Sequence, residues 1–184
     1  GQKWRNGLNK AERLGLLVEE VSATAKFSGF LDEYRAFLSR RDFETTVTPD
    51  LLKDLQPSLG PEHGMRAWRC SREGQLLAGV LIARYGGRAE YLVGILTDTA
   101  RPYAAGQLVL WRALLAGKEA GVRWFDLGGM DPALTPEGVR SFEAGLGGMP
   151  YQLAREIEAD DSGLRSRLVR WRITRARANT SRAS

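Results

Sequence analysis

Three strand-like segments follow one another closely in the middle of the chain, and they constrain the fold more than any other feature. They are Met65–Cys70, Leu76–Arg84 and Ala89–Leu96. The pairs Glu73-Gly74 and Gly86-Gly87 between them are turn signals of hairpin length. The middle segment contains the run LLAGVLIA, which is apolar on both faces and so predicts a central strand. The sequence therefore predicts an antiparallel meander around which the other elements pack.

Helical patterns flank this meander on both sides in the sequence. In the segment 26–41, apolar residues recur at the three-four spacing of a buried stripe. Thr48-Pro49-Asp50 is a good helix start, because proline is favoured at the first helical position. Further helices are predicted over 3–13 and 104–120, a loop over 97–103, and strands over 16–21, 122–125 and 151–157. We therefore expect an α/β (α+β) domain with a mixed, mostly antiparallel sheet flanked by helices.

The positive charge of the chain is concentrated at its C-terminal end. The formal net charge is +5, and residues 162–184 contain seven arginines and no acidic residue. Asp160-Asp161-Ser162 predicts the start of a last helix with arginines around most of it. A basic tail of this kind contacts phosphates of nucleic acid or lipid headgroups, or it is a solvated terminus without a partner. We expect one domain over 1–158 and a basic helix and tail over 159–184.

Cysteine and histidine are nearly absent, which narrows the chemistry. The single Cys70 forbids an internal disulfide and suggests a reducing compartment. The single His63 does not suffice for a zinc site, and a histidine-dependent nucleophile would rest on this one loop residue. No apolar run approaches the roughly 20 residues of a transmembrane helix. We expect a cytoplasmic protein without a metal.

A carboxylate and a glycine turn follow the strand predicted over 122–125. Asp126 stands at the end of that strand, Gly128-Gly129 lets the backbone turn, and a short helix then ends at Gly147-Gly148. A strand end with a carboxylate beside a glycine turn is a common way to build a site. Alternatively, Asp126 caps a loop and the glycines only form turns. If Gly129 requires a positive φ, Gly129→Val should destabilise or misplace the Asp126 loop.

Three separated motifs resemble the FemABX aminoacyltransferases. Lys3-Trp4-Arg5-Asn6, with Asn9-Lys10-Ala11 and Gly15, resembles the opening of the second half of those proteins. Leu108–Gly129 resembles their long helix and the following strand, with its (D/F)xGG ending. Gly138–Gly148 is similar to their GLxxFKxGFGG motif. The motifs occur in the family's order and cover most of residues 3–148.

This resemblance implies a fold and a function. FemABX proteins consist of two GNAT-like domains and transfer an amino acid from aminoacyl-tRNA to an amine of a peptidoglycan precursor. The chain resembles the second domain, so we expect a GNAT-like domain with the first domain missing. The resemblance implies substrate binding by Lys3, Arg5, Asn6, Arg140, Phe142 and Glu143. Arg165, Arg167 and Arg170 would contact tRNA, and the tail could also contact a membrane surface.

One position departs from the family motif. The family has lysine directly after the motif phenylalanine, where it is associated with the phosphates of the precursor, whereas this chain has Glu143. A carboxylate repels phosphates, and Arg140 could replace the lysine charge from one helical turn away. The transfer itself needs bound reactants, an oxyanion site and a proton acceptor. Backbone N–H groups near the end of Ala89–Leu96 could bind the oxyanion, and Asp126 or Asp131 could accept the proton of the amine.

Two other functions remain open. Residues 101–106 resemble the pyrophosphate-binding loop of GCN5-related N-acetyltransferases, with Ala104 in place of the first glycine. This loop, with Arg101 and Tyr103 as substrate-binding residues, would make the chain an acyl-CoA-dependent N-acyltransferase. No other cofactor is expected. Alternatively, half of a two-domain protein could be a non-catalytic binding or assembly domain.

Overall fold

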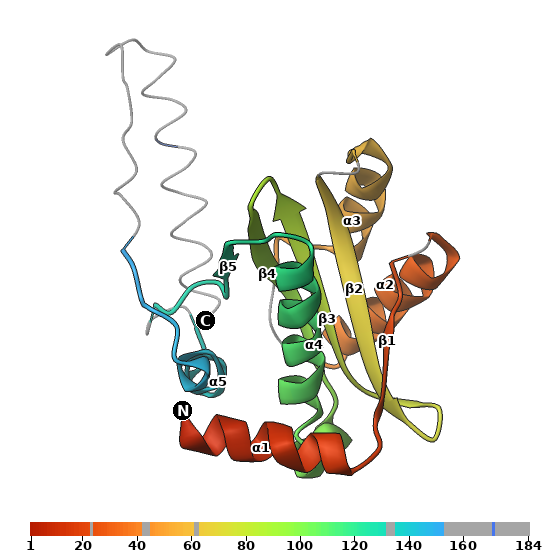
Figure 1. The fold of residues 1–184 in the computed structure, drawn as a ribbon. Helices are drawn as coiled ribbons and strands as arrows, with labels where there is room; N and C mark the ends of the chain where they lie inside the picture. Colours follow the sequence, from red (N-terminus) through yellow and green to blue (C-terminus); the bar gives the residue numbers. More distant parts are fainter. Residues whose placement is uncertain (23, 42–44, 61–62, 132–134, 153–170, 172–184) are drawn as a thin grey trace. The chain divides into compact units, whose positions relative to one another are not determined.

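A five-stranded sheet lies at the centre of the first of two structural units (Figure 1). The computed structural model describes residues 1–22, 24–41, 45–60, 63–131, 135–152 and 171. The first unit is Gly1–Met149 and the second is Pro150–Ser184. The last strand and the last helix predicted from the sequence fall almost entirely outside the described residues, as do Arg165, Arg167 and Arg170.

The sheet has the order β1-β2-β3-β4-β5. β1 to β4 pair antiparallel and β5 pairs parallel with β4. β3 is the central strand, which confirms the prediction from its apolar run. A tight turn at Glu73 and Gly74, both with positive φ, joins β2 to β3. The bounds of the strands are β1 Leu17–Glu20, β2 His63–Arg72, β3 Gln75–Tyr85, β4 Arg88–Leu96 and β5 Trp124–Asp126.

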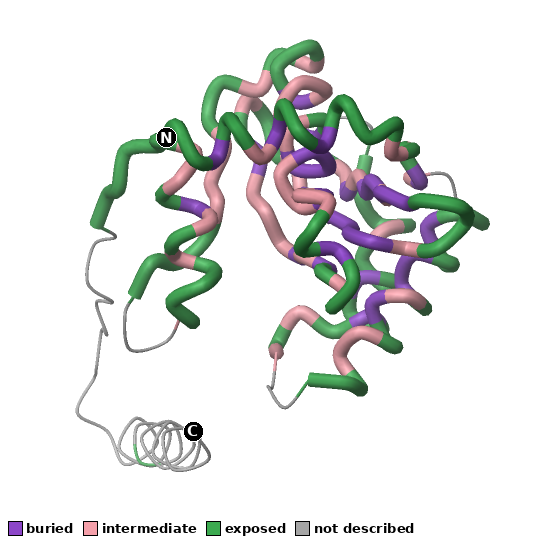
Figure 2. The backbone as a smooth tube through the Cα atoms, turned by 90° about the horizontal axis from the view of Figure 1, so that it is seen from below, coloured by how far each residue is buried: buried purple, intermediate pink, exposed green. Residues whose placement is uncertain are grey.

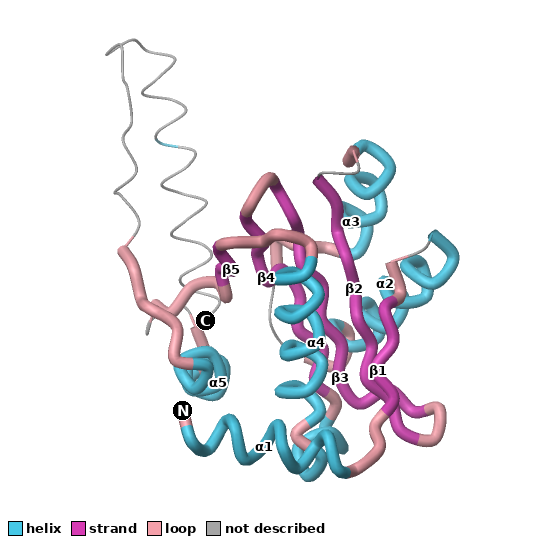
Figure 3. Tube along the Cα trace, in the orientation of Figure 1, coloured by secondary structure: helices cyan, strands magenta, loops and turns pink. Residues whose placement is uncertain are grey.

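Helices cover both faces of the sheet (Figure 3). On one face α1 (Gln2–Arg13) and α4 (Ala105–Glu119) form a core with Trp68 and Val80 of the sheet. On the other face α2 (Thr24–Leu38) and α3 (Pro49–Leu55) pack on Leu81 and Val93. Figure 2 shows the buried residues gathered between these layers. The arrangement confirms the predicted α/β class with a mixed, mostly antiparallel sheet.

The ends of the helices follow local sequence signals. The Thr48 hydroxyl accepts the N–H of Leu51 and caps α3, as its sequence predicts. The segment predicted as a loop after β4 instead forms a 3-10 helix, η2 (Asp98–Tyr103), and another, η1 (Gln56–Ser58), follows α3. α5 (Glu137–Leu146) ends where Gly147 takes a positive φ. No described helix has the length and apolar character needed to cross a bilayer.

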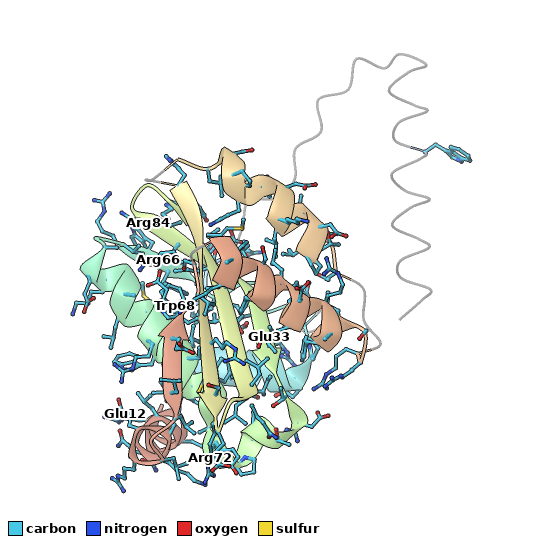
Figure 4. The ribbon with its side chains drawn as sticks, turned by 90° about the vertical axis from the view of Figure 1, so that its right-hand side faces the viewer. Glu12, Glu33, Arg66, Trp68, Arg72 and Arg84 are labelled. Atoms are coloured by element: carbon cyan, nitrogen blue, oxygen red, sulfur yellow. The ribbon has the colours of Figure 1, made fainter. Side chains whose placement is uncertain are left out.

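Ion pairs join the outer strands and helices to the sheet. Arg66 of β2 binds Glu20 of β1, and its guanidinium lies 5.2 Å from the centre of the Trp68 ring (Figure 4). On the other face, Arg69 donates to Glu33 of α2 at 2.8 Å. These pairs hold the β1 edge and α2 against β2.

A β-bulge in β4 reverses the direction of its side chains. Tyr91 pairs with Ile82 and Val93 with Leu81, so Leu92 is the extra residue. Before the bulge, Ala89 and Tyr91 pack on the core beneath α4, and after it Val93 packs on the core beneath α2. The next residue, Gly94, therefore lies on the same face as Tyr91.

Candidate functional site

The candidate site lies where β4 and β5 separate. The two strands pair only from Arg88↔Trp124 to Glu90↔Asp126. Beyond Glu90, β4 continues to Leu96, and that edge pairs with no strand among the residues that the structure describes. An unpaired edge presents backbone N–H groups, which can bind the oxygen of an acyl group. This is the strand end at which the sequence predicted the oxyanion donors.

The phenol of Tyr91 occupies the space above Gly94 at this edge. A Cβ built on Gly94 would lie 1.9 Å from the Tyr91 hydroxyl oxygen and 2.9 Å from its Cζ atom. The ring can lie along the strand only because residue 94 has no side chain and because the bulge turns both residues to one face. Neither Tyr91 nor Gly94 was predicted as a site residue, since a bulge leaves no signal in simple alternation.

α1 and α5 meet beside this edge through aromatic packing. The ring of Trp4 lies 6.2 Å from that of Phe142, and a Cβ on Gly145 would lie 2.9 Å from Trp4 Cδ1. Phe142 also approaches the first turn of α4, because a Cβ on Gly106 would lie 3.8 Å from Phe142 Cε2. Two motifs that are far apart in the sequence thus come together in space, and Phe142 seats α5 rather than facing open solvent.

Glu143 is a buried acid beside the separating strands. It is 6% exposed, and its Oε2 atom has no hydrogen-bond partner among the described residues. Burial raises the pKa of Glu143, and the negative charge of Asp126 raises it further. Burial and the charge of Glu143 likewise raise the pKa of Tyr91. Asp126, Glu143 and Tyr91, from three different elements, therefore form one electrostatically coupled group.

The two aspartates predicted to accept a proton differ in position. Asp126 is half-buried at the end of β5, and its Oδ1 accepts the N–H of Gly128 at 2.9 Å. Asp131 is exposed, and its backbone oxygen accepts the N–H of Thr135. Gly128 has a φ of 102°, whereas Gly129 is not among the residues with positive φ. The condition set for Gly129 is therefore not met, because the positive φ of this turn lies at Gly128, whose N–H Asp126 accepts.

The other residues predicted to bind substrate are spread over the surface. Lys3, Arg5 and Asn6 are exposed on α1, where Gln2 donates to Asn6. A hollow of about 320 Å³ on this side is lined by Asn6, Asn9, Lys10, Arg13 and Leu14. A second, of about 480 Å³, lies between β1 and α4. Asp126 lines neither hollow, so the case for the site rests on the strand edge and the buried acid.

Arg140, Arg101 and Tyr103 are also partly engaged within the protein. Arg140 binds Glu137 on its own helix, while its buried Nε has no partner among the described residues. Tyr103 lies beneath the guanidinium of Arg72, 5.0 Å from it, and Arg101 is exposed in η2. Of the residues predicted to bind substrate, Phe142 and Glu143 lie beside the strand edge, whereas Arg101 lies in η2, the connection before α4.

The sequence of the chain matches a known family over most of its length. The model of the acetyltransferase (GNAT) domain matches residues 2–153. The chain belongs to this family. No curated protein matches the chain.

Solved structures share the fold of this GNAT domain. The crystal structure of FemX is similar, with a TM-score of 0.65 and 14% identity over 78% of this chain and 52% of FemX. The chain thus spans about half the length of FemX. An aminoglycoside acetyltransferase, HMB0005, from an uncultured soil metagenomic sample has a TM-score of 0.55 and 12% identity, covering 79% of this chain and 99% of its own. The ribosomal-protein-S18-alanine N-acetyltransferase from Escherichia coli has a TM-score of 0.53 and 11% identity, covering 72% of this chain and 76% of its own.

The start of α4 is a poor fit for the pyrophosphate of an acyl-CoA. α1 crosses the N-terminal end of α4 (Figure 1), and a Cβ on Gly7 would lie 3.5 Å from the Cβ of Ala104. Ala104 itself takes a left-handed conformation with a φ of 51°. A helix N-terminus binds phosphate through its free N–H groups, and here a neighbouring helix packs against that turn. This packing of α1 disfavours a pyrophosphate at the start of α4, and no acyl-CoA step is derived through this turn.

Proposed function

We propose that the chain is an N-acyltransferase that transfers an aminoacyl group from aminoacyl-tRNA to an amine of a peptidoglycan precursor. The observation that carries this choice of donor is the packing of α1 across the first turn of α4. A donor that carries its acyl group on the ribose of tRNA does not need a pyrophosphate cradle at that turn. The similarity of the fold to FemX and the three FemABX-like motifs support the same choice.

The chemistry needs few protein groups, because an aminoacyl ester is already activated. The amine nitrogen forms a bond to the acyl carbon, the ester C–O bond breaks, and the ribose oxygen leaves with a proton. The unpaired edge of β4 would stabilise the oxyanion formed on the way. Holding the two reactants together supplies much of the remaining acceleration.

The basic surface of α1 suits a tRNA donor. Lys3, Arg5, Lys10 and Arg13 are exposed on this helix. We propose that they contact tRNA phosphates, together with Arg165, Arg167 and Arg170, and that the protein acts in the cytoplasm. The basic C-terminal segment is also proposed to approach a membrane surface when the precursor is lipid-linked.

An acyl-CoA donor is the second candidate. It is favoured by the family match and by the likeness of residues 101–106 to a pyrophosphate-binding loop. It is disfavoured by the packing of α1 against Ala104.

A transfer assay separates these donors. The full chain is incubated with tRNA charged with radiolabelled amino acids, or with acetyl-CoA, and with N-acetyl-L-lysine amide as the amine. We expect a labelled lysine amide product from charged tRNA, and tRNA binding that weakens steeply with salt. Product from acetyl-CoA but not from charged tRNA would favour the second candidate. A domain that binds tRNA without transferring its amino acid would be a binding or assembly domain.

A further inference from the structure

Glu143 stands out because it is a buried acid that forms no ion pair with a cation among the described residues. It is 6% exposed and its Oε2 has no hydrogen-bond partner among the described residues. An unpaired buried carboxylate is costly, so proteins retain one chiefly where a ligand or a proton completes it. Tyr91 of β4 and Asp126 at the end of β5 interact electrostatically with Glu143, Arg140 and Glu137 lie on its own helix, and the amino group of Gly1 donates to the oxygen of Gly145. β4 also carries Arg88 and Glu90, and α1 carries Lys3 and Arg5 at exposed positions.

Asp126 is the charged group that raises the pKa of Glu143 together with burial. Arg140 is bonded to Glu137, and α1 contributes the uncharged indole of Trp4 to its contact with α5. Asp126 adds a second negative charge, and the Tyr91 phenol, held over Gly94, adds a neutral donor and acceptor. Two acids and a phenol beside a strand edge match the chemistry of a primary ammonium group, which carries one positive charge and three donors.

We propose that Glu143 binds the ammonium form of the attacking amine and removes the proton that must leave before the nitrogen attacks. This inference rests on the proposed acyl transfer and names the residue that prepares its nucleophile. One proton passes from the R–NH₃⁺ group to the Glu143 carboxylate, which becomes a neutral acid. The freed nitrogen lone pair then forms the C–N bond, and the C–O bond of the ester breaks.

The environment of Glu143 suits this role better than that of either aspartate. Because burial and Asp126 raise the pKa of Glu143, its carboxylate is a stronger base than an exposed one. Asp126 is already engaged with the Gly128 N–H, and Asp131 is exposed beyond the turn. Taking up a proton also neutralises the buried negative charge of Glu143, which further favours proton transfer from the amine.

The first test compares nucleophiles that do and do not carry the proton. Glu143→Gln keeps the shape of the side chain but cannot accept a proton. With N-acetyl-L-lysine amide, which is an ammonium ion at neutral pH, we expect kcat/KM to fall about 100-fold or more. With hydroxylamine, which is a weak base and mostly unprotonated at neutral pH, we expect almost no change. The matched control is Glu119→Gln, at an exposed acid of α4. Equal losses with both nucleophiles, or none with either, would overturn the proposal while leaving the transfer activity established.

The second test needs no activity. In the full chain, the carboxyl carbon of Glu143 is followed by ¹³C NMR across pH. N-acetyl-L-lysine amide should lower the pKa of Glu143, whereas the uncharged N-acetyl-L-norleucine amide should not. Glycinamide carries only an α-ammonium, as the aminoacyl donor does, and a shift with glycinamide but not with the lysine amide would overturn the proposal. If neither amine lowers the pKa, or if the norleucine amide lowers it equally, the proposal is overturned even when transfer is observed.

Discussion

The hydroxyl oxygen of Tyr91 lies only 1.9 Å from the point where the Cβ of an alanine at position 94 would be. The contact links the bulge in β4 to the candidate site, because the bulge puts both residues on one face. Among the tyrosines whose pKa shifts are described, Tyr91 is also the only one whose pKa is raised by the charge of Glu143.

Gly94→Ala should therefore displace the Tyr91 ring. We expect a loss of about 1–3 kcal/mol in the free energy of unfolding, because the new methyl group overfills this space. Tyr91→Phe removes the atom that lies nearest to it, so the double variant should lose less than the sum of the two single losses. Urea unfolding of the four proteins measures this coupling. Strict additivity would show that Tyr91 does not lie over Gly94.

Gly145→Ala tests the junction of α1 and α5. The added Cβ would lie 2.9 Å from Trp4 Cδ1 and 3.3 Å from Trp4 Cβ. We expect the clash, about 1–3 kcal/mol, to exceed the helix-propensity gain of up to about 1 kcal/mol. Gly138→Ala in the same helix is the matched control, since a Cβ there meets nothing within 4 Å. The control should be neutral or stabilising in thermal unfolding. A Gly145→Ala protein as stable as this control would rule out the Trp4 contact.

Glu143→Gln should stabilise the protein in a pH-dependent manner. The folded pKa of Glu143 is raised above its ordinary value of 4.5, so the folded state holds the proton more tightly than the unfolded state. The stabilisation that protonated Glu143 gives the folded wild-type protein is fully present below about pH 4.5 and is lost as pH rises through the folded pKa. The Glu143→Gln variant carries no ionisable group at this position, so its stability does not fall in this way. At neutral pH we expect it to be more stable by about 1–2 kcal/mol, with the difference vanishing below the ordinary pKa. A pH-independent difference in melting temperature would contradict the raised pKa.

The two glycines after β5 should respond differently to the same change. Gly128 has a φ of 102°, which strains any L side chain, and we expect Gly128→Ala to cost roughly 1–2 kcal/mol. It should also move Asp126, whose carboxylate accepts the Gly128 N–H. At Gly129 a Cβ would meet only the Thr135 hydroxyl at 3.9 Å, so Gly129→Ala should change stability by less than about 0.5 kcal/mol. Equal effects in chemical denaturation would show that the turn does not bend at Gly128.

Much of the fold could be predicted because its signals are local. The apolar run of β3, the Thr48 cap and the positive-φ glycine after α5 each depend on neighbouring residues, and each was found where the sequence predicted it. The family resemblance likewise depended on three continuous motifs. The donor and the acceptor stay predictions, because these motifs indicate the fold of the chain and do not identify its substrates.

The strand content and the helical stripes follow from the order of residues along the chain, since period and turn chemistry act over a few positions. The site required the tertiary structure. Tyr91 and Gly94 share a face only because of a bulge, and β4 and β5 separate only after Glu90. Glu143 is a buried acid on α5, a helix that packs against Trp4 of α1. Each of these depends on the packing of segments far apart in the sequence, and burial of a charge is a property of that packing rather than of the residue.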